Sequence, residues 1–170
     1  MEDAFPTLRA YRKQRARLHT DDKILTAWNG LMIAALCGLY RITRADTYLV
    51  AAKRAQSFIE QRLCDGDTLY VSFRDGRRGA RGFLDDYAAY CYALLALYDV
   101  TLENGYLTRA GQMAAKAAAD FFDAAHGGYT LSGRENETLI LNRKESYDGA
   151  MPSGNGLMAY NLVRLSALLP

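Results

Sequence analysis

The chain has 170 residues, half of them apolar, and a formal net charge of +2 at pH 7. This length allows one domain with a sizeable core, and the nearly balanced charge argues neither for nor against a nucleic-acid partner. No apolar run reaches the ~20 residues that cross a bilayer, and the N-terminus lacks the apolar core of a signal peptide. We therefore expect a single cytoplasmic domain, residues 1–170, without a membrane span.

The cysteines and histidines favour neither a disulfide framework nor a metal site. Cys37, Cys64 and Cys91 are odd in number and widely spaced, and no CxxC pair occurs. Cys37 and Cys91 lie in apolar runs, where a reduced cysteine behaves as a small hydrophobe, which fits a reducing compartment. His19 and His126 have no ligand-type spacing to the cysteines, so we predict no metal and no cofactor.

The first predicted elements in chain order are helices. Residues 5–18 read as an amphipathic helix with a strongly charged outer face. Residues 27–43 are apolar around most of the circumference, which predicts a helix buried on all sides. Residues 46–63 place apolar side chains at i, i+3, i+4 and i+7 and charged ones opposite, which predicts a half-exposed helix.

The next elements repeat this alternation. Residues 68–83 predict a β-hairpin about Asp75-Gly76. Residues 85–101 are again apolar all round, and residues 106–125 are again amphipathic. Residues 127–154 predict a second hairpin, with strands near 128–132 and 138–142, and residues 154–169 a third apolar helix.

The three apolar helices form a repeat. The tetrapeptide NGLM occurs at 29–32 and at 155–158, and Tyr40 aligns with Tyr98 at an offset of 58 residues. An inner ring of apolar helices inside an outer ring of amphipathic ones predicts a mainly α, partial (α/α)6 toroid with short β-hairpins in its long loops. Six hairpins need roughly 360 residues, so the chain supplies about three and is expected to be a fragment of a larger barrel protein. Two copies could close one ring as a homodimer.

Every long loop precedes an inner helix, so the long loops are predicted to share one end of the toroid, which we call the mouth. The segments HTDDKILTAWNG, RGFLDDYAAY and RKESYDGAMPSGNG lead into the three inner helices. Each combines carboxylates, an aromatic residue and polar side chains. Paired carboxylates provide the acid and base of sugar chemistry, and aromatic rings stack on pyranoses.

The candidate catalytic residues are Asp86, Asp148 and, as third choice, His19. Each has a structural alternative. Asp85 and Asp86 stand where a helix begins and can cap it, and Asp148-Gly149 is a common turn pair. His19 is close to two aspartates, which favours it over His126 as a general base.

The candidate substrate-binding residues are aromatic or polar. Trp28 and Tyr87 could stack on a sugar ring, although Trp28 could also be core. Hydrogen bonds to hydroxyls or to an anionic group are predicted for Asn29, Lys144 and Asn155. Arg143 and Glu145, beside Lys144, could form ion pairs or hold an anionic substrate.

At DDKILTAWNGLMIAAL, GFLDDYAAY and KESYDGAMPSGNG the chain resembles the thioredoxin-domain-containing proteins of the YyaL type, which include spermatogenesis-associated relatives. The resemblance runs from about His19 to the C-terminus. It implies a barrel similar to N-acylglucosamine 2-epimerases and six-hairpin glycosidases, and hence a carbohydrate-handling ancestry. It carries no catalytic residue over, because the family's own reaction is not established. The family's thioredoxin-like domain has no counterpart here.

Three functions follow as hypotheses. The first is binding of a sugar or glycan, with hydrolysis or epimerisation by acid/base carboxylates. The second is a non-catalytic docking or regulatory domain beside a redox partner. The third, ranked last, is a nucleic-acid or phosphate site that uses the arginines of the predicted hairpin, Arg74, Arg77, Arg78 and Arg81.

Overall fold

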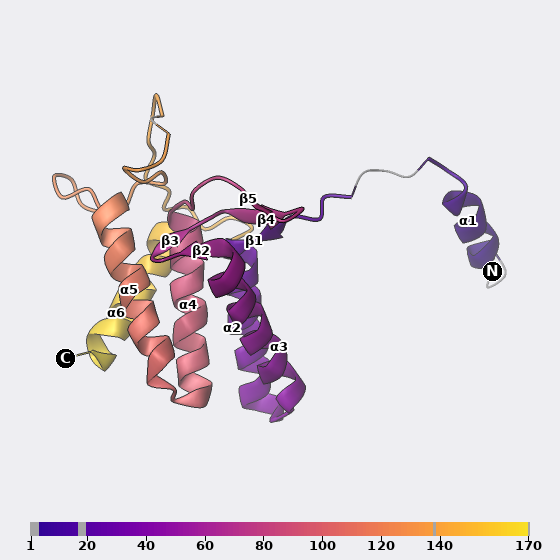
Figure 1. Ribbon diagram of the computed structural model, residues 1–170, viewed down its shortest axis with the longest axis horizontal. Coiled ribbons are helices and arrows are strands. Elements are labelled where there is room, and N and C mark those ends of the chain that lie inside the picture. Colours follow the sequence, from indigo (N-terminus) through magenta and orange to yellow (C-terminus); the bar gives the residue numbers. More distant parts are fainter. Residues whose placement is uncertain (1–3, 17–19, 138, 170) are drawn as a thin grey trace.

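The computed structural model describes residues 4–16, 20–137 and 139–169. Within these ranges, five α-helices pack in two layers and a sixth lies apart from them (Figure 1), and a π-helical turn, Ile59–Leu63 (η1), continues α3. The five packed helices are Thr26–Thr43 (α2), Asp46–Phe58 (α3), Leu84–Thr101 (α4), Asn104–Phe121 (α5) and Gly154–Leu168 (α6). The inner layer is α2, α4 and α6, and the outer layer is α3 and α5. The predicted mainly helical architecture of α/α-hairpins is confirmed.

The central inner helix, α4, holds the layers together. It packs against α2 on one side, α6 on the other and α5 behind. Its buried residues lie all round its axis, as expected for a helix with apolar residues on every side. α5 buries only one face, which includes Leu107, Met113 and Phe121. The difference between the two kinds of helix read from the sequence is therefore the difference between the layers.

The turns from inner to outer helix repeat in detail. Arg44 and Leu102 end α2 and α4 in the left-handed conformation, with φ of 58° and 57°. Their backbone amides donate to the carbonyls of Tyr40 and Tyr98. These tyrosines are the pair whose alignment gave the offset of 58 residues. The repeat is thus confirmed, with two equivalent helical hairpins.

The first return segment, residues 64–83, leads from the outer layer to α4 and forms two small sheets. β2 (Cys64–Asp65) pairs with β3 (Thr68–Leu69), and β4 (Ser72–Arg74) pairs with both β5 (Arg77–Arg78) and β1 (Ile24–Leu25). Asp75 and Gly76 make the β4–β5 turn with φ of 49° and 76°, the left-handed values of a tight hairpin. The predicted hairpin is confirmed; the pairing with β1 was not predicted.

The second return segment, residues 122–153, contains no strand among its described residues, so the predicted second hairpin is wrong. Position 138 lies outside the described residues. Three features replace a ladder: an isolated bridge between Phe122 and Tyr129, one backbone hydrogen bond from the Leu131 N–H to the Arg143 carbonyl, and the Asn142 side chain. The Asn142 amide accepts from the Ser132 N–H and donates to the Ser132 carbonyl. A side chain thus supplies the hydrogen bonds that a neighbouring strand would supply.

The N-terminal helix, Ala4–Lys13 (α1), stands away from the packed helices (Figure 1). None of its residues is buried. The prediction of a helix here is confirmed, but its packing as an outer helix is wrong. At the edge of the inner layer, α2 exposes Trp28, Met32 and Ile42, and α6 exposes Val163. Closure of the ring by a second copy stays a prediction.

The described helices include none that is both long and apolar enough to cross a membrane. The three cysteines are buried and free. Burial raises the pKa of the Cys37 thiol to about 11 and those of Cys64 and Cys91 to about 12. They are therefore packing residues that stay protonated at neutral pH, as expected for cysteines in apolar runs.

Candidate active site

The predicted mouth exists as one end of the helical layers. The N-termini of α2, α4 and α6 and both return segments lie at this end, and the short turns at Arg44 and Leu102 lie at the other (Figure 1). The first N–H groups of three inner helices, which have no acceptor within their own helix, therefore converge here. The mouth is defined below by the first turns of these helices and by residues 143–153.

Asp86 joins the starts of two inner helices. Its carboxylate is 4% exposed and accepts from the Ala27 amide of α2, at 3.1 Å, and from the Phe83 amide before α4, at 2.9 Å. Burial raises the pKa of Asp86 to about 7, and the two amide hydrogen bonds oppose that rise. Both oxygens are used inside the protein. The position is that of a helix cap shared by α2 and α4, which was the structural alternative for this residue.

The adjacent carboxylate points to the third inner helix. Asp85 accepts a hydrogen bond from the Gly154 amide, at the first residue of α6, and its pKa is raised by burial. A Cβ at Gly154 would lie 2.4 Å from an Asp85 oxygen, so the helix start fits closely over this side chain. The Asp-Asp pair at the start of α4 therefore ties together all three inner helices.

The two NGLM copies differ in their contacts. Asn29 donates to the Leu25 carbonyl of its own helix start. Asn155 instead bonds to the second return segment: it accepts from the Tyr129 amide and donates to the carbonyls of Tyr129 and Glu145. Gly30 permits close packing, because a Cβ there would lie 2.7 Å from the Ala89 carbonyl oxygen of α4. The two NGLM copies therefore occupy equivalent positions at the starts of α2 and α6, but their asparagines bind different partners.

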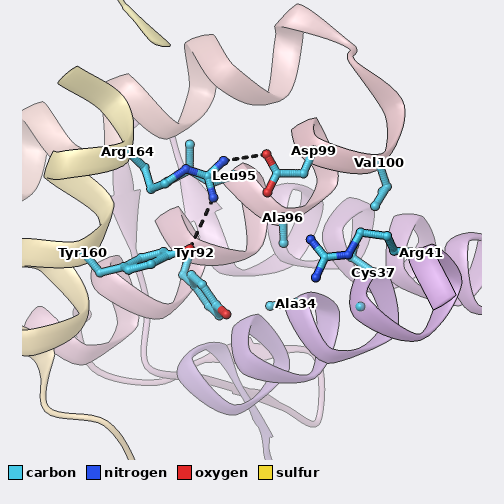
Figure 2. Close-up of a pocket in the computed structure, with 11 residues that line it drawn as sticks. Ala34, Cys37, Arg41, Tyr92, Leu95, Ala96, Asp99, Val100, Tyr160 and Arg164 are labelled. Carbon is cyan, nitrogen blue, oxygen red and sulfur yellow. Dashed lines mark hydrogen bonds and ion pairs between the residues drawn. The ribbon is translucent and has the colours of Figure 1, made fainter. Parts of the chain in front are cut away.

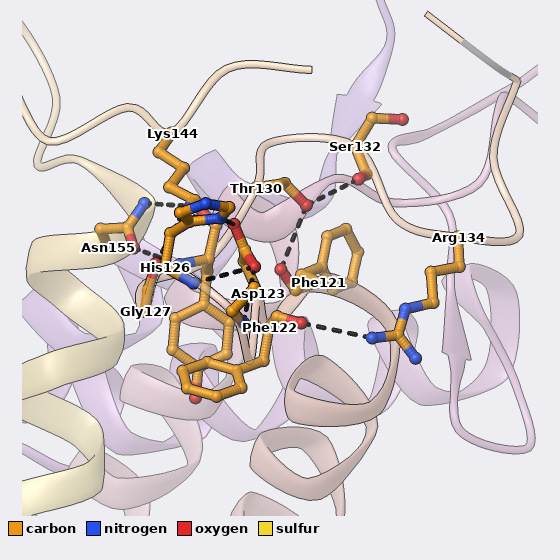
Figure 3. Close-up of polar contacts among 12 residues, drawn as sticks. Phe121, Phe122, Asp123, His126, Gly127, Thr130, Ser132, Arg134, Lys144 and Asn155 are labelled. Atoms are coloured by element: carbon orange, nitrogen blue, oxygen red, sulfur yellow. Dashed lines mark hydrogen bonds and ion pairs between the residues drawn. The ribbon is translucent and has the colours of Figure 1, made fainter.

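Lys144 also holds the loop rather than facing an open cavity. Its ammonium pairs with the Asp123 carboxylate at 2.7 Å and donates to the Gly127 carbonyl at 2.6 Å (Figure 3). This ion pair is the main reason that the pKa of Asp123 is well below its usual range. His126 is exposed in the same turn and contacts Asp123. The predicted binding residues Lys144 and Asn155 thus both shape the wall of the mouth.

Asp148 is the predicted carboxylate that faces the mouth. It is exposed and lines a cavity of about 360 Å³ together with Leu31, Tyr92 and Tyr160 from the three inner helices. One oxygen accepts from the Ser153 amide at 2.8 Å, which lowers the pKa of Asp148. Ser153 in turn caps α6 by accepting from the Gly156 amide, as predicted. Asp148 is therefore a fixed, ionised carboxylate beside two tyrosine rings.

The two predicted aromatic platforms have opposite positions. Trp28 is 62% exposed and lines an apolar cavity of about 540 Å³ with Leu31 and Met151, so the reading as core is wrong. Tyr87 is 2% exposed; its ring packs against Phe121 at 5.3 Å, and its hydroxyl accepts from the Leu69 amide. Stacking of Tyr87 on a ligand is incompatible with that burial.

Tyr92 and Tyr160 were not predicted. Their rings meet edge to face at 5.5 Å between α4 and α6. In the sequence they are two more aromatic positions in apolar helices, and only the helix rotation shows that they face the cavity. What identifies Tyr92 and Tyr160 as cavity residues is that they are partly exposed between buried neighbours, and this can be seen only once the helices are packed.

The remaining candidates are His19 and the arginines of the first return segment, and none of these arginines lines the Asp148 cavity. His19 lies outside the described residues. Among the residues that are described, no group of three or more His, Cys, Asp and Glu side chains could hold a metal ion. The arginines of the first return segment pair within the protein: Arg74 with Asp22, and Arg78 with Asp65.

Comparison with known proteins gives the ancestry of this arrangement. The chain is 32% identical over 168 residues to spermatogenesis-associated protein 20 of Rattus norvegicus, covering 92% of this chain and 21% of that protein. The human protein of the same name is 33% identical over 165 residues. This chain is a homologue of part of spermatogenesis-associated protein 20.

The chain spans about a fifth of the length of the relatives that it matches. An uncharacterized protein of Caenorhabditis elegans is likewise 32% identical over 166 residues, which are 93% of this chain and 22% of that protein. No family model matches the chain.

Solved structures place this chain in a known fold. The cellobiose 2-epimerase of Bacillus thermoamylovorans superposes with a TM-score of 0.68 at 21% identity, covering 88% of this chain and 39% of that one. The α-mannanase BT2949 of Bacteroides thetaiotaomicron gives 0.61 at 20% identity, covering 69% and 34%. The fold is therefore part of an (α/α)6 barrel, as predicted.

Proposed function

We propose that the mouth binds a sugar, with Asp148 as the carboxylate that contacts its hydroxyls. The observation that carries the proposal is the cavity of about 360 Å³ in which this ionised carboxylate meets Tyr92 and Tyr160. Aromatic faces bind the apolar faces of pyranoses, and a carboxylate accepts strong hydrogen bonds from hydroxyls. The sugar epimerases and mannanase among the structural neighbours support this ligand class.

Trp28 extends the proposed site. Leu31 lines both the Asp148 cavity and the apolar cavity beside Trp28, so the two are neighbours along α2. A glycan longer than one ring could place its second ring against the indole. Asp86 would then act as a positioning residue, since it fixes the α2 start that carries Trp28.

The residues of the Asp148 cavity do not support glycoside hydrolysis. Hydrolysis of a glycoside ordinarily uses two carboxyl groups on opposite sides of the bond. The lining of the Asp148 cavity contains one, among the residues described. Sugar binding therefore fits these residues better than hydrolysis by this chain, and an epimerisation would need a second proton donor on the opposite face of the sugar in addition to Asp148.

A non-catalytic docking domain is the second candidate. It is favoured by the large apolar side chains that α2 and α6 expose, among them Met32, Ile42 and Val163. It would leave the mouth without a small ligand.

Thermal unfolding in the presence of hexoses and disaccharides separates the candidates. A ligand that binds the folded state raises the midpoint, by an amount that grows with its concentration. We expect a rise with at least one sugar, lost in Asp148→Asn but kept in Asp46→Asn, which changes an exposed carboxylate at the start of α3, away from the mouth. The absence of any rise across the panel would favour the docking domain.

A further inference from the structure

A second cavity, of about 160 Å³, lies further along the same inner helices. Figure 2 shows the polar side chains around it: Arg41 from α2, Asp99 from α4, and Tyr160 and Arg164 from α6. Two guanidinium groups and one carboxylate therefore surround this space.

One of the two arginines is already held in place. Arg164 donates to the Asp99 carboxylate at 2.6 Å and to the Tyr160 hydroxyl at 3.3 Å. These contacts neutralise one cation and fix the guanidinium plane. Because the Tyr160 hydroxyl accepts from Arg164, its own proton remains available to a ligand.

Arg41 is the cation left over. Its guanidinium extends from α2 toward Ala96 and the tyrosines in Figure 2. No hydrogen bond or ion pair joins Arg41 to any residue that the structure describes, and the same holds for the Tyr92 hydroxyl. With Asp99 balanced by Arg164, the lining carries a net charge of about +1, together with free N–H and O–H donors.

The two cavities share a wall. Tyr92 and Tyr160 line both this space and the cavity of Asp148. On α6 the sequence Gly156, Tyr160, Arg164 advances one helical turn at each step, about 6 Å, from the mouth toward the arginines. A ligand bound at Asp148 would therefore have its far end directed at Arg41.

We propose that Arg41 and Arg164 bind an oxyanion, a phosphate or a carboxylate, carried by the sugar that occupies the mouth. The ligand class is thus an anionic sugar rather than a neutral one. A planar guanidinium with no protein partner is suited to paired hydrogen bonds with such a group. The sugar part of this inference rests on the proposed function; the anion site does not.

The test is a calorimetric titration of the whole chain with four probes: inorganic phosphate, glucose, glucose 6-phosphate and glucuronate. We expect at least one anionic sugar to bind about tenfold more tightly than glucose, or tighter still. Which of them shows the gain separates phosphate from carboxylate. Arg41→Gln should remove the gain. Arg54→Gln, the same charge change at an exposed position of α3, should keep it.

The outcomes distinguish this inference from the function beneath it. Equal affinity for glucose and both anionic sugars, or a gain that survives Arg41→Gln, would overturn the inference and leave the sugar site standing. Arg41-dependent binding of inorganic phosphate without binding of any sugar would support the anion site and overturn the proposed function. A chain that binds none of the four probes would overturn both. Arg41→Gln should unfold at the same midpoint as the wild type, because no described residue depends on Arg41.

Discussion

The two return segments lead to the same end of the molecule and are built differently. Residues 64–83 close on themselves through backbone pairing, and β4 also pairs with β1 ahead of α2. Residues 122–153 form no strand among their described residues; isolated backbone bonds, such as Leu131 N–H to the Arg143 carbonyl, are supplemented by side chains: Asn142 on Ser132, Lys144 on Asp123 and Asn155 on Tyr129. A ladder fixes its segment by many equivalent bonds, whereas side-chain contacts concentrate stability in a few residues. The candidate site faces the second kind of wall.

The largest expected effect is at the joint between the inner helices. Asp86→Ala leaves the Ala27 and Phe83 amides buried without acceptors. We expect a loss of about 3 kcal/mol in the free energy of unfolding, measured by urea denaturation. Tyr98→Phe, on the same helix and without a recorded side-chain hydrogen bond, is a control that should change little. A loss below about 1 kcal/mol for Asp86→Ala would mean that the helix starts do not depend on this cap.

The next effect concerns the close contact of α2 with α4. Gly30→Ala would place a Cβ 2.7 Å from the Ala89 carbonyl oxygen, and backbone cannot move aside as a side chain can. We expect about 2 kcal/mol of destabilisation. Gly38→Ala, in the same helix but facing open space, should instead stabilise by about 0.5–1 kcal/mol because alanine favours helix. Equal effects at the two glycines would contradict the packing described.

A single substitution should loosen the attachment of the second return segment to α6. Asn155→Ala removes three hydrogen bonds between α6 and the loop, at a cost of about 1–2 kcal/mol. Amide hydrogen exchange should become faster at Tyr129 and Leu131 and stay unchanged in residues 64–83. Asn29→Ala removes only a contact within its own helix start and should cost less. Similar losses at Asn29 and Asn155 would show that the repeat imposes the same role on both.

The fourth expected effect is a dependence on pH rather than the loss of a contact, and it belongs to Asp86. Its pKa of about 7 in the folded chain exceeds the ~3.9 of an unfolded aspartate, so the folded state holds the proton more tightly. The free energy of unfolding should therefore fall as pH rises from about 4 to 7. Asp86→Asn should reduce that slope. Asp148→Asn should leave it unchanged, because the pKa of Asp148 is lowered and its contribution is lost only as pH falls below about 4. An unchanged slope in Asp86→Asn would contradict the burial assigned to this carboxyl.

The helices could be predicted from the sequence because the spacing of apolar residues along the chain is enough to identify them. The inner helices 27–43 and 85–101 were placed within one residue at their starts, and Asp75-Gly76 identified its turn by chemistry. The second hairpin failed because alternation in 128–142 cannot distinguish a strand partner from the side chain of Asn142. The packing of α1 failed because amphipathicity predicts a helix without showing which surface receives it.

The candidate site was harder to predict than the fold. Residue type alone suggested Asp86 and Tyr87, yet both are buried, because their places on α4 face neighbouring helices. Asp148 and Trp28 lie at the mouth as expected. Tyr92, Tyr160 and Arg41 were not predicted, because the rotation of a helix about its axis decides whether such a residue contacts a neighbouring helix or lines a cavity. The sequence does not give that rotation.

The most direct test of the sugar site uses the indole of Trp28, which is the single tryptophan of the chain and lies beside the mouth. Its fluorescence should change in a saturable way when the sugar that raises the unfolding midpoint is titrated in. The apparent affinity should match that midpoint shift and should weaken about tenfold in Asp148→Asn. A fluorescence signal that stays flat through saturation, or an affinity that is the same in Asp148→Asn, would contradict a sugar site at this mouth.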